Sequence, residues 1–159
     1  MKKTLLLATI LSTAAFSTTT SAWAESFTPI RDAKITAACG ECHMTFFPQM
    51  LPQASWQKII GDLSNHFGED ASLDAETQAY VLKYHLDDAA DVTSTRAARK
   101  WMSRVDLSNP PERIVTAPRF IKKHSDRDFT RMWDRLNIRS KANCVACHKD
   151  AQRGIFDDD

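Results

Sequence analysis

The sequence predicts an all-α fold of few short helices joined by long loops. Apolar residues recur at three- and four-residue steps, and prolines and glycines interrupt the chain between these stretches. No segment alternates apolar and polar residues as a strand would. With 159 residues, the chain suffices for one domain or two very small ones.

Residues 1–24 are predicted to form a secretory signal peptide outside this fold. Two lysines precede an apolar run, and the stretch ends on the small-residue pattern Ala-Trp-Ala. The run is shorter than the ~20 residues that a membrane-spanning helix needs. Cleavage would leave 135 residues with 19 basic and 20 acidic side chains. We therefore expect a soluble protein exported to the periplasm, and its near-neutral charge argues against nucleic acid as a partner.

The mature chain is predicted to divide into an N-terminal region, 25–95, and a C-terminal region, 96–159, which could also form one intertwined domain. The first region carries helical patterns over 32–39, 55–68 and 74–91. In the second region we expect helices over 95–105, 116–124 and 129–136, and a last helix after Ser140.

All four cysteines of the chain lie in two copies of one pattern. These are "CGECH" at 39–43 and "CVACH" at 144–148. C-x-x-C-H is the attachment signature of c-type haem. Two thiols three residues apart lie on one side of a helical turn, and the next histidine can bind the iron. We expect two covalently attached haem c groups, with the helices and loops packed around them. Cys39, Cys42, Cys144 and Cys147 would be the attachment residues, and His43 and His148 the proximal ligands.

Other uses of paired cysteines fit the spacing less well. One zinc ion shared by both pairs would need a far shorter separation than the 101 residues between Cys42 and Cys144. A thioredoxin-like redox pair needs a βαβ context, which is missing here. Two disulfides would leave the adjoining histidines unexplained.

Function depends on what fills the second axial position of each iron. The remaining histidines are His66, His85 and His124. His66 extends an apolar helix face, and His124 ends a short apolar helix, so both are predicted distal ligands. His85 is interpreted as a surface residue or one behind the ligands. Met50, Met102 and Met132 are interpreted as apolar filler, and Met44 stands too close to His43 to reach the opposite haem face.

The chain resembles the small exported dihaem cytochromes c of bacteria. The resemblance covers nearly all of the mature chain, through "CGECHM", "LPQASW", "HFGEDASLD", "YHLDDAAD", "RIVTAPRFIKKH" and "RSKANCVACHKDAQRGIFDDD". It implies bis-histidine haems, with His66 and His124 matching the distal histidines, and an electron-transfer role. It also implies redox partner proteins, such as an oxygen-binding monohaem cytochrome and a membrane b-type cytochrome. We expect His66 to pair with the first motif and His124 with the second, although a crossover between halves stays open.

Two further groups of side chains have competing interpretations. The aromatic residues that could line the haems are Phe46, Phe47, Trp56, Phe67, Phe120 and Trp133. The cationic helix face of Arg96, Arg99, Lys100 and Arg104 could steer an acidic partner, pair with haem propionates or face solvent.

The leading hypothesis is an electron-transfer protein without catalytic residues, because no acid–base or nucleophilic constellation stands beside the haem motifs. One alternative is a haem enzyme or sensor that binds peroxide, nitrite or oxygen at one haem. Another is a haem subunit held permanently in a larger complex.

Overall fold

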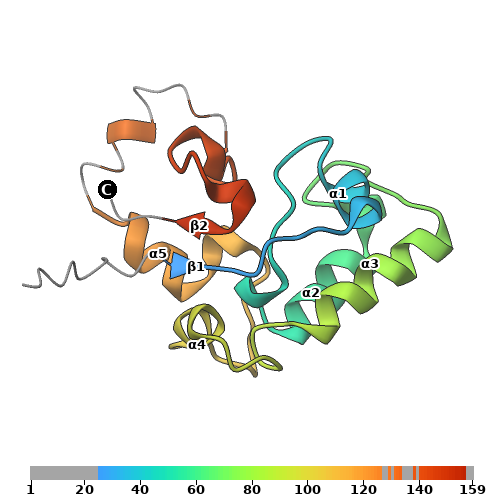
Figure 1. Ribbon diagram of the computed structural model, residues 1–159, viewed down its shortest axis with the longest axis horizontal. Helices are drawn as coiled ribbons and strands as arrows, with labels where there is room; N and C mark the ends of the chain where they lie inside the picture. The colour runs from blue at the N-terminus through green and yellow to red at the C-terminus, as the bar shows by residue number, and fades with distance from the viewer. Residues whose placement is uncertain (1–24, 127–128, 130, 134–137, 139, 157–159) are drawn as a thin grey trace, which may run out of the picture.

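The computed structural model describes residues 25–126, 129, 131–133, 138 and 140–156. Short helices and long connections dominate it, as predicted (Figure 1). The α-helices with defined bounds are α1 (Ala33–Cys39), α2 (Gln53–Gly61), α3 (Ala75–Asp87), α4 (Arg96–Met102) and α5 (Pro118–His124). Single 3₁₀ turns cover Pro48–Met50, Leu63–Asn65, Ile114–Thr116, Cys144–Ala146 and Ala151–Arg153.

Helices α2 and α3 pack against each other and bury one apolar face each. Trp56 and Ile60 of α2 lie in the same buried cluster as Val81 of α3. The α2 helix ends at Gly61, seven residues before the predicted end at Gly68. A tertiary contact explains the earlier end. The Gln78 side chain of α3 donates to the Ile60 carbonyl (2.6 Å), which would otherwise lack a hydrogen-bond partner at the end of α2.

Side-chain caps begin three of the helices at the predicted places. Asp32 accepts from the backbone N–H of Lys34 and Ile35 at the start of α1. Asp74 caps α3 and Thr95 caps α4 in the same way. Helix α3 ends at Asp87 rather than at the predicted Asp91. Beyond Asp87, the backbone N–H of Ala90 donates to the Leu51 carbonyl (2.9 Å) and not to a carbonyl of the helix.

The C-terminal region contains α4, α5 and the second cysteine motif. The predicted helix after Ser140 is wrong, since the motif lies in a 3₁₀ turn followed by another. The backbone N–H groups of Ala146, Cys147 and Ala151 donate to carbonyls three residues back, as in 3₁₀ turns, and the chain turns back at Gly154, whose φ of +80° is left-handed. The predicted helix over 129–136 falls partly outside the described residues.

The two ends of the described chain meet in a small antiparallel sheet. Strand β1 (Glu25–Ser26) pairs with β2 (Ile155–Phe156), and Phe27 donates from its backbone to the Gly154 carbonyl (2.7 Å). The sequence showed no strand pattern here, because two residues are too few to alternate. In Figure 1 this pair lies beside α5, while α1, α2 and α3 form the other side of the molecule. The division into two haem regions stays a prediction.

Within the described residues, none of the helices has the length and apolar character that crossing a membrane requires.

Candidate haem sites

The N-terminal candidate site begins at the end of α1. Cys39 is the last residue of the helix and is partly buried, whereas Cys42 is exposed. Burial raises the pKa of the Cys39 thiol, which favours an uncharged sulfur. The Nδ1 atom of His43 lies 2.7 Å from the Met44 carbonyl. This contact fixes the ring and leaves Nε2 as the nitrogen available to a metal.

A tight turn presents His66 to this site. Two backbone hydrogen bonds join His66 and Glu69 across the turn, and Phe67 and Gly68 between them have φ of +58° and +99°. The ring centres of His66 and His43 lie 6.1 Å apart, with the ring planes at 30°. The structure therefore brings together the two histidines that were expected to share the first haem, although His66 lies on a turn and not on the predicted helix.

This spacing fits a metal ion held between two imidazoles. With metal–nitrogen bonds of about 2.0 Å and ring centres about 1.1 Å further out, the centres would lie about 6.2 Å apart. The Nδ1 atom of His66 is buried and has no hydrogen-bond partner, which is unusual for a buried polar atom and fits a site completed by another group. Burial, and to a smaller extent His43 and Arg113, lowers the pKa of His66 and favours the neutral, ligating form.

The C-terminal candidate site repeats the arrangement with different elements. His124 is the last residue of α5, and its Nδ1 atom lies 2.9 Å from the Phe120 carbonyl. His148 donates from its backbone to the Cys144 carbonyl (2.8 Å), which forms one helical turn through the motif. The ring centres of His124 and His148 are also 6.1 Å apart, but their planes stand at 84°.

A cavity of about 720 Å³ adjoins this second histidine pair, within the ~300–1,000 Å³ typical of cofactor sites. Both cysteines of the second motif line it, together with the apolar side chains of Met50, Phe120 and Ile155. Burial raises the pKa of the Cys144 thiol to about 11. The site thus disfavours a thiolate there, whereas a thioether bond to a haem would carry no charge.

Among the described residues, no other histidine ring is in contact with His85. His85 is also not a surface residue. Its side chain is 2 % exposed and packs on Trp56, with ring centres 4.5 Å apart. Its Nδ1 atom lies 2.8 Å from the Val81 carbonyl, and it also has a hydrogen bond to the Phe46 backbone. The part of the sequence interpretation that placed it on the surface is therefore wrong, while a position behind the ligands fits its neighbours.

Four of the six predicted haem-lining aromatic residues lie beside candidate ligands. Phe46 stacks on His43, with ring centres 4.8 Å apart. Phe67 lies 4.8 Å from His66, while Phe120 and Trp133 lie 4.1 and 6.1 Å from His124. Phe47 and Trp56 instead belong to the ordinary core: Phe47 stacks on Phe27, and the Trp56 indole donates to the Pro48 carbonyl.

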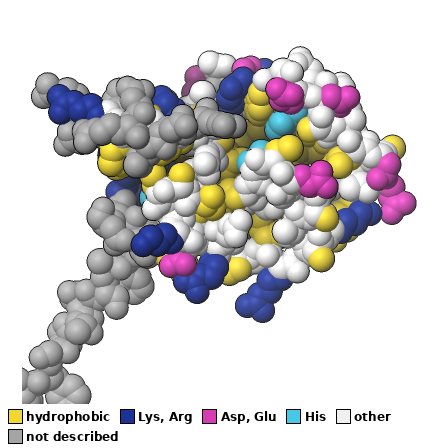
Figure 2. Space-filling model, turned by 90° about the horizontal axis from the view of Figure 1, so that it is seen from above, with side chains coloured by type: hydrophobic (Ala, Val, Ile, Leu, Met, Phe, Trp, Pro, Cys, Tyr) yellow, Lys and Arg dark blue, Asp and Glu magenta, His cyan; other side chains and the backbone are white. Residues whose placement is uncertain are grey.

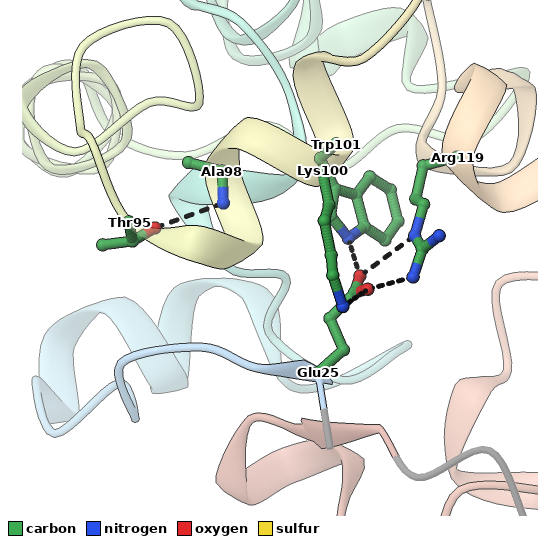
Figure 3. Close-up of polar contacts among 6 residues, drawn as sticks. All are labelled: Glu25, Thr95, Ala98, Lys100, Trp101 and Arg119. Carbon is green, nitrogen blue, oxygen red and sulfur yellow. Dashed lines mark hydrogen bonds and ion pairs between the residues drawn. The ribbon is translucent and has the colours of Figure 1, made fainter. Parts of the chain in front are cut away.

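Sequence reasoning missed a cluster of charged and polar side chains beside the C-terminal cavity (Figure 3). The Glu25 carboxylate accepts from the Trp101 indole (2.6 Å) and pairs with Arg119 and Lys100. Its side chain is only 11 % exposed. Lys100, a member of the predicted cationic face, is thus ion-paired to the N-terminal strand. The pairing of β1 with β2 and the ring contact of Phe27 with Trp101 place Glu25 beside α4.

On the face shown in Figure 2, histidine side chains are visible next to hydrophobic side chains, and one of them also lies beside an acidic side chain. Imidazoles in such surroundings are suited to an apolar, planar cofactor. Among the described residues, no cluster of three or more His, Cys, Asp or Glu side chains could hold a bare metal ion. The paired histidines fit a cofactor that supplies the remaining ligands of its own metal.

Comparison with known proteins agrees with this geometry. The family model for dihaem cytochrome c matches residues 35–156. The structure is similar to that of a dihaem cytochrome c from Rhodobacter sphaeroides, at 37 % identity and a TM-score of 0.72, over 82 % of this chain and 100 % of that chain. It is also similar to a dihaem cytochrome c from Shewanella baltica, at 33 % identity and a TM-score of 0.62, over 79 % and 86 % of the chains.

Among curated proteins, the comparison found no match. The family match nevertheless spans both C-x-x-C-H motifs and most of the described fold. The chain therefore belongs to the dihaem cytochrome c family, and it carries two haem c groups.

Proposed function

We propose that this protein is a periplasmic electron-transfer protein in which both haems are bis-histidine and low-spin. The observation that carries the proposal is the pair of 6.1 Å ring separations, His43 with His66 and His124 with His148. With both haems bound, these four histidines would supply the two protein ligands of each iron and leave no position for a substrate. We found no acid–base or nucleophilic constellation near the described parts of either site.

The residues have separate tasks in this proposal. Cys39 and Cys42 hold the first haem by thioether bonds, and Cys144 and Cys147 hold the second. Each haem, when bound, supplies an iron that exchanges one electron between its ferric and ferrous forms. The backbone carbonyls at Met44 and Phe120 orient His43 and His124, so that the ligands keep their positions in both oxidation states.

Redox partner proteins follow from this function. The resemblance to exported dihaem cytochromes supports an oxygen-binding monohaem cytochrome as one partner and a membrane b-type cytochrome as another. The protein would meet the membrane only through such a partner. Secretion of the chain and mass spectrometry of the product test the location, with a mature N-terminus at Glu25 as the expected result.

Spectroscopy of the oxidised protein tests the ligands. A pyridine haemochrome assay should count two haems c per chain. EPR should show two different low-spin species, because the imidazole planes lie at 30° in one pair and 84° in the other. The perpendicular pair should give the more anisotropic signal. A high-spin signal of one haem, or a methionine-to-iron charge-transfer band in the near infrared, would contradict the proposal.

Carbon monoxide binding to three variants tests the assignment residue by residue. The wild type should bind carbon monoxide slowly and incompletely, since both axial positions are filled. His66→Ala and His124→Ala should each produce one high-spin haem that binds one equivalent quickly. His85→Ala is the matched control and should keep both haems low-spin. Rapid stoichiometric binding by the wild type would instead favour an enzyme or sensor with one open haem.

A further inference from the structure

Charge is divided unequally between the two haem regions. Residues 25–95 contain 4 Lys and Arg against 11 Asp and Glu, a net charge of −7 with neutral histidines. Residues 96–159 contain 15 against 9, a net charge of +6. The near-neutral net charge of the mature chain is therefore the sum of a negative N-terminal region and a positive C-terminal region.

The same division holds next to the candidate ligands. Around the C-terminal site, Lys122 and Lys123 precede His124 at the end of α5, and Lys141 and Lys149 flank the second motif. The side chains of Lys123, Lys141 and Lys149 also line the cavity there. Lys122, Lys141 and Lys149 are exposed, and none of the three has an ion pair within the described part of the chain.

Acidic residues stand close in sequence to the candidate ligands of the N-terminal site. Glu41 lies inside the first motif, and Glu69 and Asp70 follow His66. All three are exposed. Arg113 is the cation described beside this site, and its guanidinium lies 4.1 Å from the centre of the Phe67 ring. In Figure 2, most Asp and Glu side chains on the visible face lie over the right half, the side of α1 and α3 in Figure 1.

Apolar side chains accompany the lysines of the C-terminal site. Ile121, three residues before His124, is 51 % exposed, and Val145, inside the second motif, is 41 % exposed. Exposed apolar groups together with like charges suit a transient interface, because the charges speed the encounter and the apolar groups make the close contact.

We propose that the lysine-rich surface around the C-terminal haem, formed by Lys122, Lys123, Lys141 and Lys149, is the docking site for an acidic electron-transfer protein. The proposal rests on the electron-transfer function above and adds which haem the partner meets and which charge it carries. An acidic partner would be attracted to this surface and repelled from the N-terminal region, so that it exchanges electrons with the C-terminal haem.

Paramagnetic probes of opposite charge test the surface on the intact oxidised protein. Hexacyanochromate(III) should broaden the NMR signals of the C-terminal haem methyl groups more than those of the N-terminal haem. Hexaamminechromium(III) should do the reverse. Equal broadening of both haems by the anion, or stronger broadening of the N-terminal haem, would overturn the proposal.

Kinetics with an acidic protein test docking, with a plant-type ferredoxin as the electron donor. At low salt, Lys122→Glu/Lys141→Glu should reduce the second-order rate at least tenfold, and it should remove most of the salt dependence. The control Lys34→Glu/Lys58→Glu makes the same charge change in the N-terminal region and should lower the rate less than threefold.

Equal losses in the two double variants would overturn the proposal, since net charge alone would then explain the effect. Unchanged absorption spectra and haem counts would show that both variants are intact. A failure of the electron-transfer function itself would be recognised separately, through rapid carbon monoxide binding by the wild type.

Discussion

His66 and His85 are both withdrawn from solvent to some degree, but the groups around their ring nitrogens differ. His85 has backbone hydrogen bonds to Val81 and Phe46. His66 has a buried Nδ1 atom without a partner and faces a second histidine at 6.1 Å. Burial alone therefore does not identify a haem ligand. The facing imidazole distinguishes the two, because His66 lies opposite His43, whereas the described ring contacts of His85 are with Trp56 and Tyr84.

The buried position of His85 predicts a pH-dependent stability. Burial lowers the pKa of His85 below its ordinary value of 6.5, and its two backbone hydrogen bonds offset only part of this effect. Below pH 6.5 the unfolded chain therefore binds more protons at this residue than the folded protein does, and the free energy of unfolding falls as the pH falls. Each unit of pKa difference contributes about 1.4 kcal/mol.

Denaturant unfolding of the holoprotein at pH 7.5 and 5.5 measures this effect. The loss of stability between the two pH values should be smaller in His85→Gln than in the wild type. The comparison is made within each protein, so that any packing loss from the substitution cancels. The same loss in both proteins would show that His85 does not cause the pH dependence.

At the scale of elements, the backbone conformation of the turn after α2 sets the position of the proposed ligand His66. Phe67 and Gly68 both have positive φ, and their turn is closed by the backbone hydrogen bonds between His66 and Glu69. A positive φ is unfavourable for a residue with a side chain, so Phe67 stores strain beside the proposed ligand His66. The Arg113 guanidinium over the Phe67 ring helps to hold this conformation.

Gly68→Ala should weaken this turn. No atom lies within 4 Å of the position of the new Cβ, so the cost comes from the backbone conformation at φ +99°. We expect the holoprotein to lose about 1–2 kcal/mol of stability, and a fraction of the N-terminal haem to become high-spin as His66 moves. Denaturant unfolding and EPR measure the two effects.

Gly61→Ala is the matched control for this substitution. Gly61 also has no atom near the new Cβ, but it is the last residue of α2 and has no positive φ. Alanine favours a helix over glycine, so this variant should be as stable as the wild type or more stable, with both haems low-spin. Equal destabilisation by the two substitutions would contradict the role given to the turn.

At the scale of the whole molecule, the N-terminal strand connects both halves of the chain. Glu25 joins β1 to α4 and α5 through Trp101, Lys100 and Arg119, and β2 brings residues 155–156 to the same place. The predicted cleavage after residue 24 would make Glu25 the first residue of the mature protein. The start of the mature chain would thus be fixed beside the C-terminal haem site.

Glu25→Gln should destabilise the holoprotein, because it keeps the shape of the side chain but removes the charge that Arg119 and Lys100 require. We expect a loss of about 1–3 kcal/mol, typical of hydrogen bonds to charged groups. Thermal unfolding measures the change. Glu76→Gln is the control: the Glu76 side chain is 90 % exposed in its pair with Lys34, and such a pair contributes little.

A Glu25→Gln variant as stable as the control would show that the buried pairs do not connect the two halves.

The sequence by itself determined the two haem attachment motifs, the all-α class and the helix starts at Asp32, Asp74 and Thr95, because each depends on residues that are neighbours along the chain. It also indicated His66 and His124 through local apolar patterns. The distance between the two histidines of each pair could not be predicted from the sequence, since it depends on how distant segments pack.

Only the tertiary structure decided the remaining features. It placed His66 on a turn because Gln78, from another helix, satisfies the end of α2. It buried His85 between α2 and α3, and it brought Glu25 to Arg119 across the sheet of the two chain ends. These contacts join residues far apart in sequence, so their free energy depends on the whole fold, and no local pattern of side chains can specify it.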